Sequence, residues 1–401
     1  MTSTHHLTFR PLARLALGAL AFALTAPLAF PSVLPVGPWS GAAGVPGSSM
    51  LPDPAAVPVE FFEEGLAGRL QITLAKPSAK APHGAYSAQL ALLHGNQTLS
   101  YRHSGMVSAN GTISETWISK TGPSLRISLA RSPMGPEAAF LVGEATLDST
   151  RYPLFALPHT ITAKNPLPLG TDGPHSLFLQ NIAIQVGTGF GTATIARAGT
   201  VKIAATLPNG TKATLSTAIL LGGSTPFLAA AGPAGKTGFL GAWALRDTSS
   251  PDSDWDGHAL ISPSSARLLL AASPKPAKGQ PAFPTATSML DLQLNPDFFA
   301  ANGQLVFDGK SRFRTASSLG AILDGANAWG VSLLSLTLNP SSGAATGRIE
   351  YFYIPSPTSE ARRETATLTG MLNRKTGEIH GRIQGIRSLS LSGPFQVSPL
   401  R

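Results

Sequence analysis

The 401-residue chain contains no cysteine. This absence excludes disulfide bonds, zinc sites with thiolate ligands, iron–sulfur clusters and a cysteine nucleophile. Charged residues are also scarce, because they make up 13% of the chain, about half of the roughly 25% typical of globular proteins. The net charge of +9 is thinly spread, and the basic residues near the C-terminus are not interleaved with aromatic residues, apart from Tyr351, Phe352 and Tyr353. The sequence therefore predicts no nucleic-acid partner.

Long apolar runs are missing as well, except at the N-terminus. There, Arg10 and Arg14 precede an uncharged apolar run from Leu15 to Ala26, which is the layout of a secretory signal. The run is shorter than the ~20 residues that a membrane-spanning helix needs. We therefore predict that residues 1–29 are a signal peptide or an uncleaved N-terminal anchor. The protein is expected to be exported to the periplasm, the cell surface (the outer-membrane surface included) or the medium, and to meet a membrane only through such an anchor.

Glycine and proline are abundant, at 41 and 34 residues, and they separate short runs in which apolar and polar residues alternate. Two Asn-Gly pairs, at residues 110–111 and 209–210, lie between such runs, and Asn-Gly is the strongest short signal for a β-hairpin. We predict an all-β protein whose antiparallel meander strands form two or three β-sandwich or β-barrel-like lobes with little helix. Residues 298–302 and 317–326 are the best places for a short helix.

Proline-rich stretches also suggest the domain boundaries. Residues 30–58 carry Pro or Gly every few positions, which a helix or a central strand does not tolerate, so we expect a tether. Residues 273–284, rich in Pro and Lys, predict a linker. The rest of the chain falls into three β blocks, at residues 59–165, 166–272 and 285–401.

The second block contains GTGFGTATIARAGTVKIAATLPNGTKATLSTAILLGGSTPFL, followed by GKTGFLGAWAL. This segment resembles a β-repeat of secreted and cell-surface proteins from planctomycete- and verrucomicrobia-type bacteria, with its glycine-rich entry, G-T-V strand, (D/N)-G-T hairpin and closing strand. The C-terminal LLSLTLNPSSGAATGRI and ATLTGML resemble the later half of that repeat. Pro208 stands where the repeat usually has alanine. The resemblance implies a secreted β architecture and no particular chemistry, because the activity of these proteins is generally unassigned.

One motif points to a metal ion. Asp252, Asp254 and Asp256 alternate in the segment DSDWDG, where the aspartates of a turn can converge on a hard cation such as Ca²⁺. The EF-hand pattern is incomplete, because position 12 counted from Asp252 is Pro263, where a bidentate Glu or Asp belongs. The three aspartates are therefore our candidate metal ligands, in a simpler calcium turn, and a solvated acidic loop is the alternative. We predict no other cofactor.

No catalytic motif is complete. Residues 230–237 fit a relaxed nucleotide-binding loop, but the residues that follow predict a strand where the bound phosphate needs a helix. The chain has no G-x-S-x-G segment for a serine nucleophile, and its nine histidines form no H-x-H or H-E-x-x-H motif. We therefore predict no catalytic or cofactor-binding residues.

These observations favour an exported, non-catalytic β-repeat protein with a structural or binding role at the cell surface or outside the cell, in adhesion or glycan binding. An anionic or neutral surface polysaccharide is the expected partner, since a basic surface attracts anionic polymers. The alternative is a secreted hydrolase, carbohydrate-active in the first instance, whose site is assembled from distant loops. A Ser–His pair at hydrogen-bonding distance, or two facing carboxylates, would favour that alternative. The sequence does not predict an oligomeric state.

Overall fold

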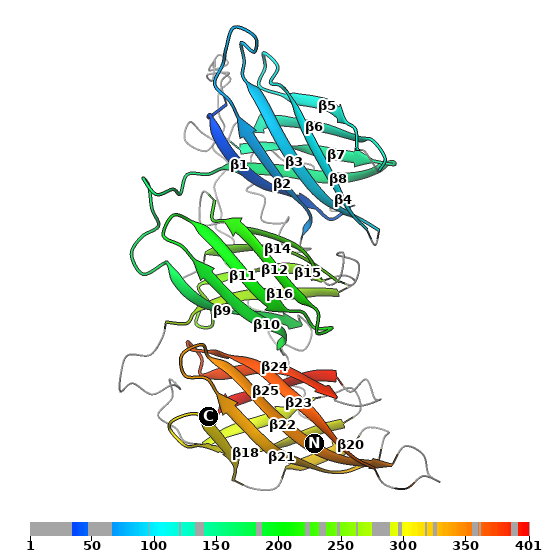
Figure 1. Cartoon of the computed structure of the whole chain (residues 1–401), viewed down its shortest axis with the longest axis vertical. Helices are drawn as coiled ribbons and strands as arrows, with labels where there is room; N and C mark the ends of the chain where they lie inside the picture. The colour runs from blue at the N-terminus through cyan, green and yellow to red at the C-terminus, as the bar shows by residue number, and fades with distance from the viewer. Residues whose placement is uncertain are drawn as a thin grey trace, which may run out of the picture.

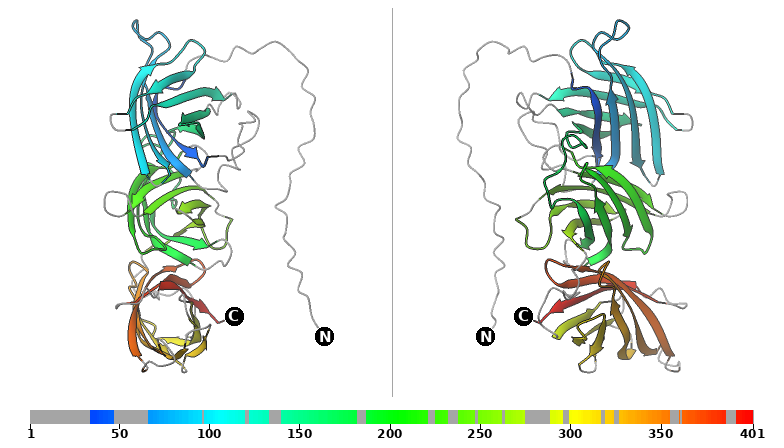
Figure 2. Two further views of the ribbon diagram at one scale, coloured as in Figure 1. Left: turned by 90° about the vertical axis from the view of Figure 1, so that its right-hand side faces the viewer. Right: turned by 60° about the vertical axis from the view of Figure 1, so that its left-hand side comes forward.

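The computed structural model describes residues 34–46, 66–95, 97–119, 122–132, 140–181, 187–220, 225–231, 238–246, 249–261, 264–274, 289–295, 299–316, 319–323, 327–354, 360, 362–385 and 392–400. Within these ranges the chain forms 25 strands in three sheets, which are stacked along one long axis (Figures 1 and 2). This confirms the predicted all-β, barrel-like fold. The predicted signal or anchor at 1–29 lies outside the described residues, as does the linker from residue 275 onward. No helix in the described ranges is long and apolar enough to span a membrane.

Lobe 1 is an eight-stranded antiparallel sheet in the order β4-β3-β2-β1-β8-β7-β6-β5. Two four-stranded meanders are joined through the pairing of the first strand with the last. The sheet curls until β4 and β5 face each other. Its strands are β1 (Gly37–Gly44), β2 (Leu66–Leu74), β3 (Ala85–His94), β4 (Gln97–Met106), β5 (Ile113–Trp117), β6 (Leu125–Ser132), β7 (Phe140–Leu147) and β8 (Thr150–Pro158).

Lobe 2 repeats this strand order with every number raised by eight, as β12-β11-β10-β9-β16-β15-β14-β13. The two lobes are therefore copies of one topology. The strands of lobe 2 are β9 (Gly173–Asn181), β10 (Gly187–Ile195), β11 (Thr200–Thr206), β12 (Lys212–Ala218), β13 (Thr225–Ala231), β14 (Gly238–Arg246), β15 (Trp255–Ile261) and β16 (Ser264–Ala272).

Lobe 3 is a closed barrel, because β17 pairs with β25 on one side and with β18 on the other. Its strands are β17 (Met289–Leu294), β18 (Phe299–Phe307), β19 (Arg312–Thr315), β20 (Gly320–Leu323), β21 (Asn327–Leu338), β22 (Ala344–Ile354), β23 (Arg362–Asn373), β24 (Glu378–Gly385) and β25 (Ser392–Pro399). The short helices expected at 298–302 and 317–326 were wrong, because β18 and β20 pair with each other in these regions.

Strand β1 corrects a second expectation. Residues 37–44, which we assigned to the tether at 30–58, form a central strand between β2 and β8. The sequence GPWSGAAG has weak strand propensity, but its small residues allow a close approach of the neighbouring strand. At Gly41, a Cβ atom would lie 1.8 Å from the carbonyl oxygen of Phe155. Proline is tolerated because Pro38 stands at the beginning of the strand.

Each barrel interior is filled with apolar side chains. Along β2, Leu70, Ile72 and Leu74 are buried in the core of lobe 1, whereas the alternate residues point outward. Trp39, Tyr101 and Trp117, along with Leu90 and Ile127, fill the same core. Lobes 2 and 3 have their own apolar cores. The described interior side chains of all three lobes are thus packed together in apolar cores.

Smaller apolar clusters join the lobes. Ala42, Leu66 and Phe155 of lobe 1 pack against Leu220 of lobe 2, and Arg69 donates a hydrogen bond to the carbonyl oxygen of Ser216 at 2.8 Å. Between lobes 2 and 3 the cluster contains Phe178, Leu269, Ala271 and Met371.

Candidate functional site: a polar groove on lobe 1

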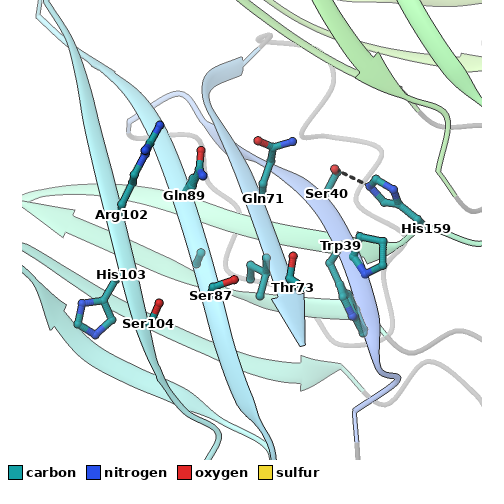
Figure 3. Close-up of a pocket in the computed structure, with 13 residues that line it drawn as sticks. Trp39, Ser40, Gln71, Thr73, Ser87, Gln89, Arg102, His103, Ser104 and His159 are labelled. Carbon is teal, nitrogen blue, oxygen red and sulfur yellow. Dashed lines mark hydrogen bonds between the residues drawn. The ribbon is translucent and has the colours of Figure 1, made fainter. Parts of the chain in front are cut away.

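A groove of about 450 Å³ lies on the outer face of lobe 1, across strands β1 to β4 (Figure 3). Its floor is the curved sheet itself. The walls come from outward side chains of these four strands and from His159, which follows β8. No sequence motif marked this region.

The groove is organised by the strand register. Ser40, Gln71, Gln89 and Arg102 stand directly opposite one another on β1, β2, β3 and β4, and form one row of polar side chains, the first rung (Figure 3). Neighbouring strands lie about 4.8 Å apart, so the first rung is about 14 Å long.

A second rung runs parallel to the first. Its members are paired in the same way and lie two residues from the first rung on each strand: Pro38, Thr73, Ser87 and Ser104. Successive outward residues of one strand are separated by about 7 Å. The row between the two rungs faces the barrel interior, where Trp39 and Ile72 are buried. The groove is therefore a grid of hydroxyl, amide and guanidinium groups above an apolar core.

The lining residues carry positive charge and no negative charge. Arg102 is exposed at one end of the first rung, and no aspartate or glutamate lines the groove within the described part of the chain. At the other end, burial and then the nearby charge of Arg69 lower the pKa of His159. The imidazole is therefore neutral at pH 7, and the groove consists of hydrogen-bonding groups and one accessible cation.

Ser40 and His159 form the closest polar pair in the groove. The Oγ atom of Ser40 lies 2.7 Å from Nε2 of His159, and Ser40 is buried. A hydroxyl beside a neutral imidazole satisfies the first requirement of a serine nucleophile. Two further requirements are not met by the described residues: no carboxylate accepts a hydrogen bond from the other ring nitrogen, and Ser40 lies in a ladder-paired central strand rather than at an exposed turn.

The predicted metal ligands lie around the start of β15, where Asp252 and Asp254 precede the strand and Asp256 is its second residue. Two basic side chains pair with the three aspartates: Asp256 accepts from Nε of Arg267 at 2.9 Å, Asp252 is 3.4 Å from the same guanidinium, and Asp254 pairs with Lys375 of lobe 3 at 3.0 Å. Asp254 also accepts the backbone N–H of Ala272 at 2.6 Å. The described residues contain no group of three His, Asp or Glu arranged around a common point. Calcium binding by the three aspartates stays a prediction.

A third polar cluster bridges the place where the edge strands β4 and β5 of lobe 1 meet, which we call the seam. Glu115 of β5 accepts hydrogen bonds from the Tyr86 hydroxyl at 2.9 Å and from His103 of β4 at 2.5 Å, and the Trp117 ring stacks on His103 at 5.7 Å. Burial and then the bond to Glu115 raise the pKa of Tyr86. The β4 and β5 edges are not joined by a backbone ladder, so these side chains connect the two strands. We assign the cluster a structural role.

The nucleotide-loop pattern at 230–237 is excluded by the strands around it. Strand β13 pairs antiparallel with β14, which begins at Gly238, so a strand follows where a phosphate site needs a helix. Residues 232–237 themselves lie outside the described ranges.

No protein-family model matches this chain, and no curated protein matches it. Among solved structures it is similar to the isotype 1 transferrin binding protein B from serogroup B Neisseria meningitidis, at 9% sequence identity and a TM-score of 0.24. The match covers 83% of this chain and 65% of that chain, slightly less than two thirds of its length. At this TM-score the similarity carries no functional argument. The fold and the groove by themselves define the structural class, which is tandem filled β-barrels with an external polar groove.

Proposed function

We propose that this protein is an exported, non-catalytic binding protein of the cell surface or extracellular space, and that the groove of lobe 1 binds a surface polysaccharide in an extended conformation. The observation that carries the proposal is the pair of rungs across β1 to β4. They present hydroxyl and amide groups at regular strand spacing along a shallow channel, and such groups recognise the hydroxyls of a sugar chain. The apolar packing of the described barrel interiors also supports a ligand site on the outer surface.

Titration calorimetry with soluble polysaccharides tests this proposal. Replacing Gln71 and Gln89 together by alanine removes the centre of the first rung and should abolish binding. A matched control exists in lobe 3, where Gln293 and Gln396 also stand directly opposite each other on paired strands. The Gln293→Ala, Gln396→Ala variant should bind as the wild type does. Equal affinity of both double variants, or no binding by the wild type, would refute the groove as a polysaccharide site.

A secreted hydrolase is the second candidate function, and the Ser40–His159 contact at 2.7 Å favours it. In this reaction Oγ of Ser40 attacks an ester carbonyl of a substituted carbohydrate, Nε2 of His159 takes the hydroxyl proton and passes it to the leaving alkoxide, and water then releases the acid. A fluorophosphonate probe followed by mass spectrometry distinguishes the two functions. Labelling of Ser40 that Ser40→Ala abolishes and Ser87→Ala retains would establish the hydrolase, whereas an unlabelled protein supports the binding function.

Two earlier expectations remain proposals. The relationship to secreted β-repeat proteins is supported by the repeated strand order of lobes 1 and 2. Calcium binding by Asp252, Asp254 and Asp256 is supported by their alternation in one short segment, and it is tested below.

A further inference from the structure

The charge of the groove narrows the class of its ligand. Arg102 lies in the middle of β4 and stands directly opposite Gln89, with Ser104 two residues away on its own strand and Ser87 opposite Ser104. Among the described residues, no carboxylate lies within ion-pair distance of Arg102. By contrast, Arg267 and Arg363 each have an acidic partner. The guanidinium of Arg102 is therefore available to a ligand.

The neighbouring strands add no negative charge. β1 contributes Pro38 and Ser40, and β3 contributes Ser87 and Gln89. β2 contributes Gln71 and Thr73, and one rung beyond them stands Arg69, whose charge reaches His159. Two other ionisable side chains of β4 are directed toward the barrel interior: His103 bonds to Glu115 at the inner seam, and Tyr101 is buried in the core. Among the described residues, every ionisable side chain that lines the groove is thus basic.

Hydrogen-bonding chemistry agrees with this charge. A guanidinium offers five N–H donors and no acceptor, and it holds a carboxylate or sulfate by two parallel hydrogen bonds. The Gln89 amide, directly opposite Arg102 on β3, supplies further donors beside it, and the Ser87 and Ser104 hydroxyls line the second rung of the same groove (Figure 3). An arginine in this position adds little to the affinity for a neutral sugar, whereas it forms a charge-assisted hydrogen bond with an acidic sugar.

Building on the proposed function, we infer that the groove binds an anionic polysaccharide and that Arg102, with Gln89 opposite it, forms the subsite for its carboxylate or sulfate group. The polymer then extends from this subsite along the first rung over Gln71 to Ser40. A carboxylate-bearing and a sulfated polymer share the chemistry that Arg102 recognises.

The test uses titration calorimetry of the full chain with three probes: oligogalacturonate, dextran sulfate and neutral dextran. Arg102→Gln removes the charge and should weaken binding of the acidic probes roughly tenfold or more, because hydrogen bonds to charged groups contribute about 1.5–3 kcal/mol. Arg102→Lys should give an intermediate affinity, since lysine keeps the charge but loses the paired geometry. Arg126→Gln is the matched control, because Arg126 is an exposed arginine on β6 of the same lobe, opposite Thr146.

The outcomes separate this inference from the proposed function. Preference for one acidic probe would identify the acidic group, and binding that weakens with added salt would support the ionic contact. Equal binding of neutral dextran together with an unchanged Arg102→Gln variant would overturn the anion subsite. In that case the proposed function stands if the Gln71, Gln89 double variant still loses binding. Failure of the wild type to bind any of the three probes would overturn both.

Discussion

The Nζ atom of Lys375 lies 3.0 Å from Oδ1 of Asp254 and connects the β23–β24 turn of lobe 3 to the acidic segment of lobe 2. The same ammonium group donates hydrogen bonds to the carbonyl oxygens of Ser250 at 3.1 Å and Ser253 at 2.6 Å. Beside it, the side-chain amide of Asn373 donates to the carbonyl oxygen of Asp252 at 2.8 Å. The β23–β24 turn of lobe 3 is thus bound to the acidic segment of lobe 2 by one ion pair and several hydrogen bonds.

Removing this ammonium group should weaken the contact between the lobes. Lys375→Met leaves the Asp254 carboxylate and two carbonyl oxygens without their donor, and we expect it to lower the free energy of unfolding by about 1–3 kcal/mol. Lys202→Met, at an exposed position of β11, should change it little. Urea unfolding of both variants measures the difference, and equal stability of the two would show that the ion pair does not stabilise the interface.

The calcium prediction can be tested at the same place. If calcium binds to Asp252, Asp254 and Asp256, the melting temperature should rise with millimolar calcium and fall with chelator. Selective binding to the native state adds about 2.7 kcal/mol at a hundredfold excess over Kd. Asp254→Asn should remove that rise, and it should also lower the calcium-free melting temperature because it weakens the contact with Lys375. If calcium and chelator leave the melting temperature of the wild type unchanged, the three aspartates serve only in ion pairs.

Strand β1 should be sensitive to a single methyl group. In Gly41→Ala the new Cβ would lie 1.8 Å from the carbonyl oxygen of Phe155, which forces β1 and β8 apart. We expect the free energy of unfolding to fall by about 1–3 kcal/mol, which is the usual cost of overpacking. At Gly330 an added Cβ meets no atom within 4 Å, so Gly330→Ala is the control. Thermal melting that gives Gly41→Ala wild-type stability would be incompatible with a central β1.

The seam of lobe 1 should depend on Glu115. Glu115→Ala removes the acceptor shared by Tyr86 and His103, and we expect it to lower the free energy of unfolding by about 1–3 kcal/mol. Glu144→Ala, on β7 of the same lobe, is the control. Hydrogen exchange should show faster exchange in β4 and β5 of the Glu115 variant. Exchange that stays at the wild-type rate in both strands would contradict the role of this cluster in closing the seam.

Stability should fall between pH 7 and pH 5. Burial lowers the pKa of His159 and of His175 below the ordinary value of 6.5. The unfolded chain therefore binds more protons than the native state as pH drops through 6.5 toward the lowered values, and protonation favours unfolding. The stabilising effect of the neutral imidazoles is complete above pH 6.5. Melting temperatures against pH should show a smaller slope for His159→Asn than for the wild type.

Much of the local structure follows from the sequence. Alternation in β2 sends Leu70 and Ile72 inward and Arg69 and Gln71 outward, because successive side chains of a strand point to opposite faces. The Asn-Gly pair at 209–210 joins β11 and β12, where Gly210 adopts a positive φ of 83° that glycine accepts without strain. Such features depend on residues that are near one another in the chain, so the all-β class and the hairpin at 209–210 could be predicted. The Asn-Gly pair at 110–111 instead joins β4 to β5, which stand at opposite ends of the lobe 1 sheet and form no ladder with each other.

The groove could not be predicted in the same way. The outward polar residues of β2, β3 and β4 are visible as an alternating pattern, but the pattern does not tell which residue of one strand faces which residue of the next. The strand register decides which side chains stand opposite one another in the first rung, namely Arg102, Gln89, Gln71 and Ser40. A slip of one strand by one residue would turn each of its side chains to the other face of the sheet.

Contacts between distant segments were decided by the tertiary structure alone. Ser40 meets His159 across 119 positions, and Lys375 meets Asp254 across 121. The sequence by itself determined that Asp252, Asp254 and Asp256 form a concentrated negative charge, and only folding supplied Arg267 and Lys375 as partners. Likewise GPWSGAAG carries turn-forming residues, and it became a central strand because β2 and β8 satisfy its backbone hydrogen bonds from both sides. Local composition sets the propensity of a segment, whereas burial and backbone pairing with remote strands determine its final place.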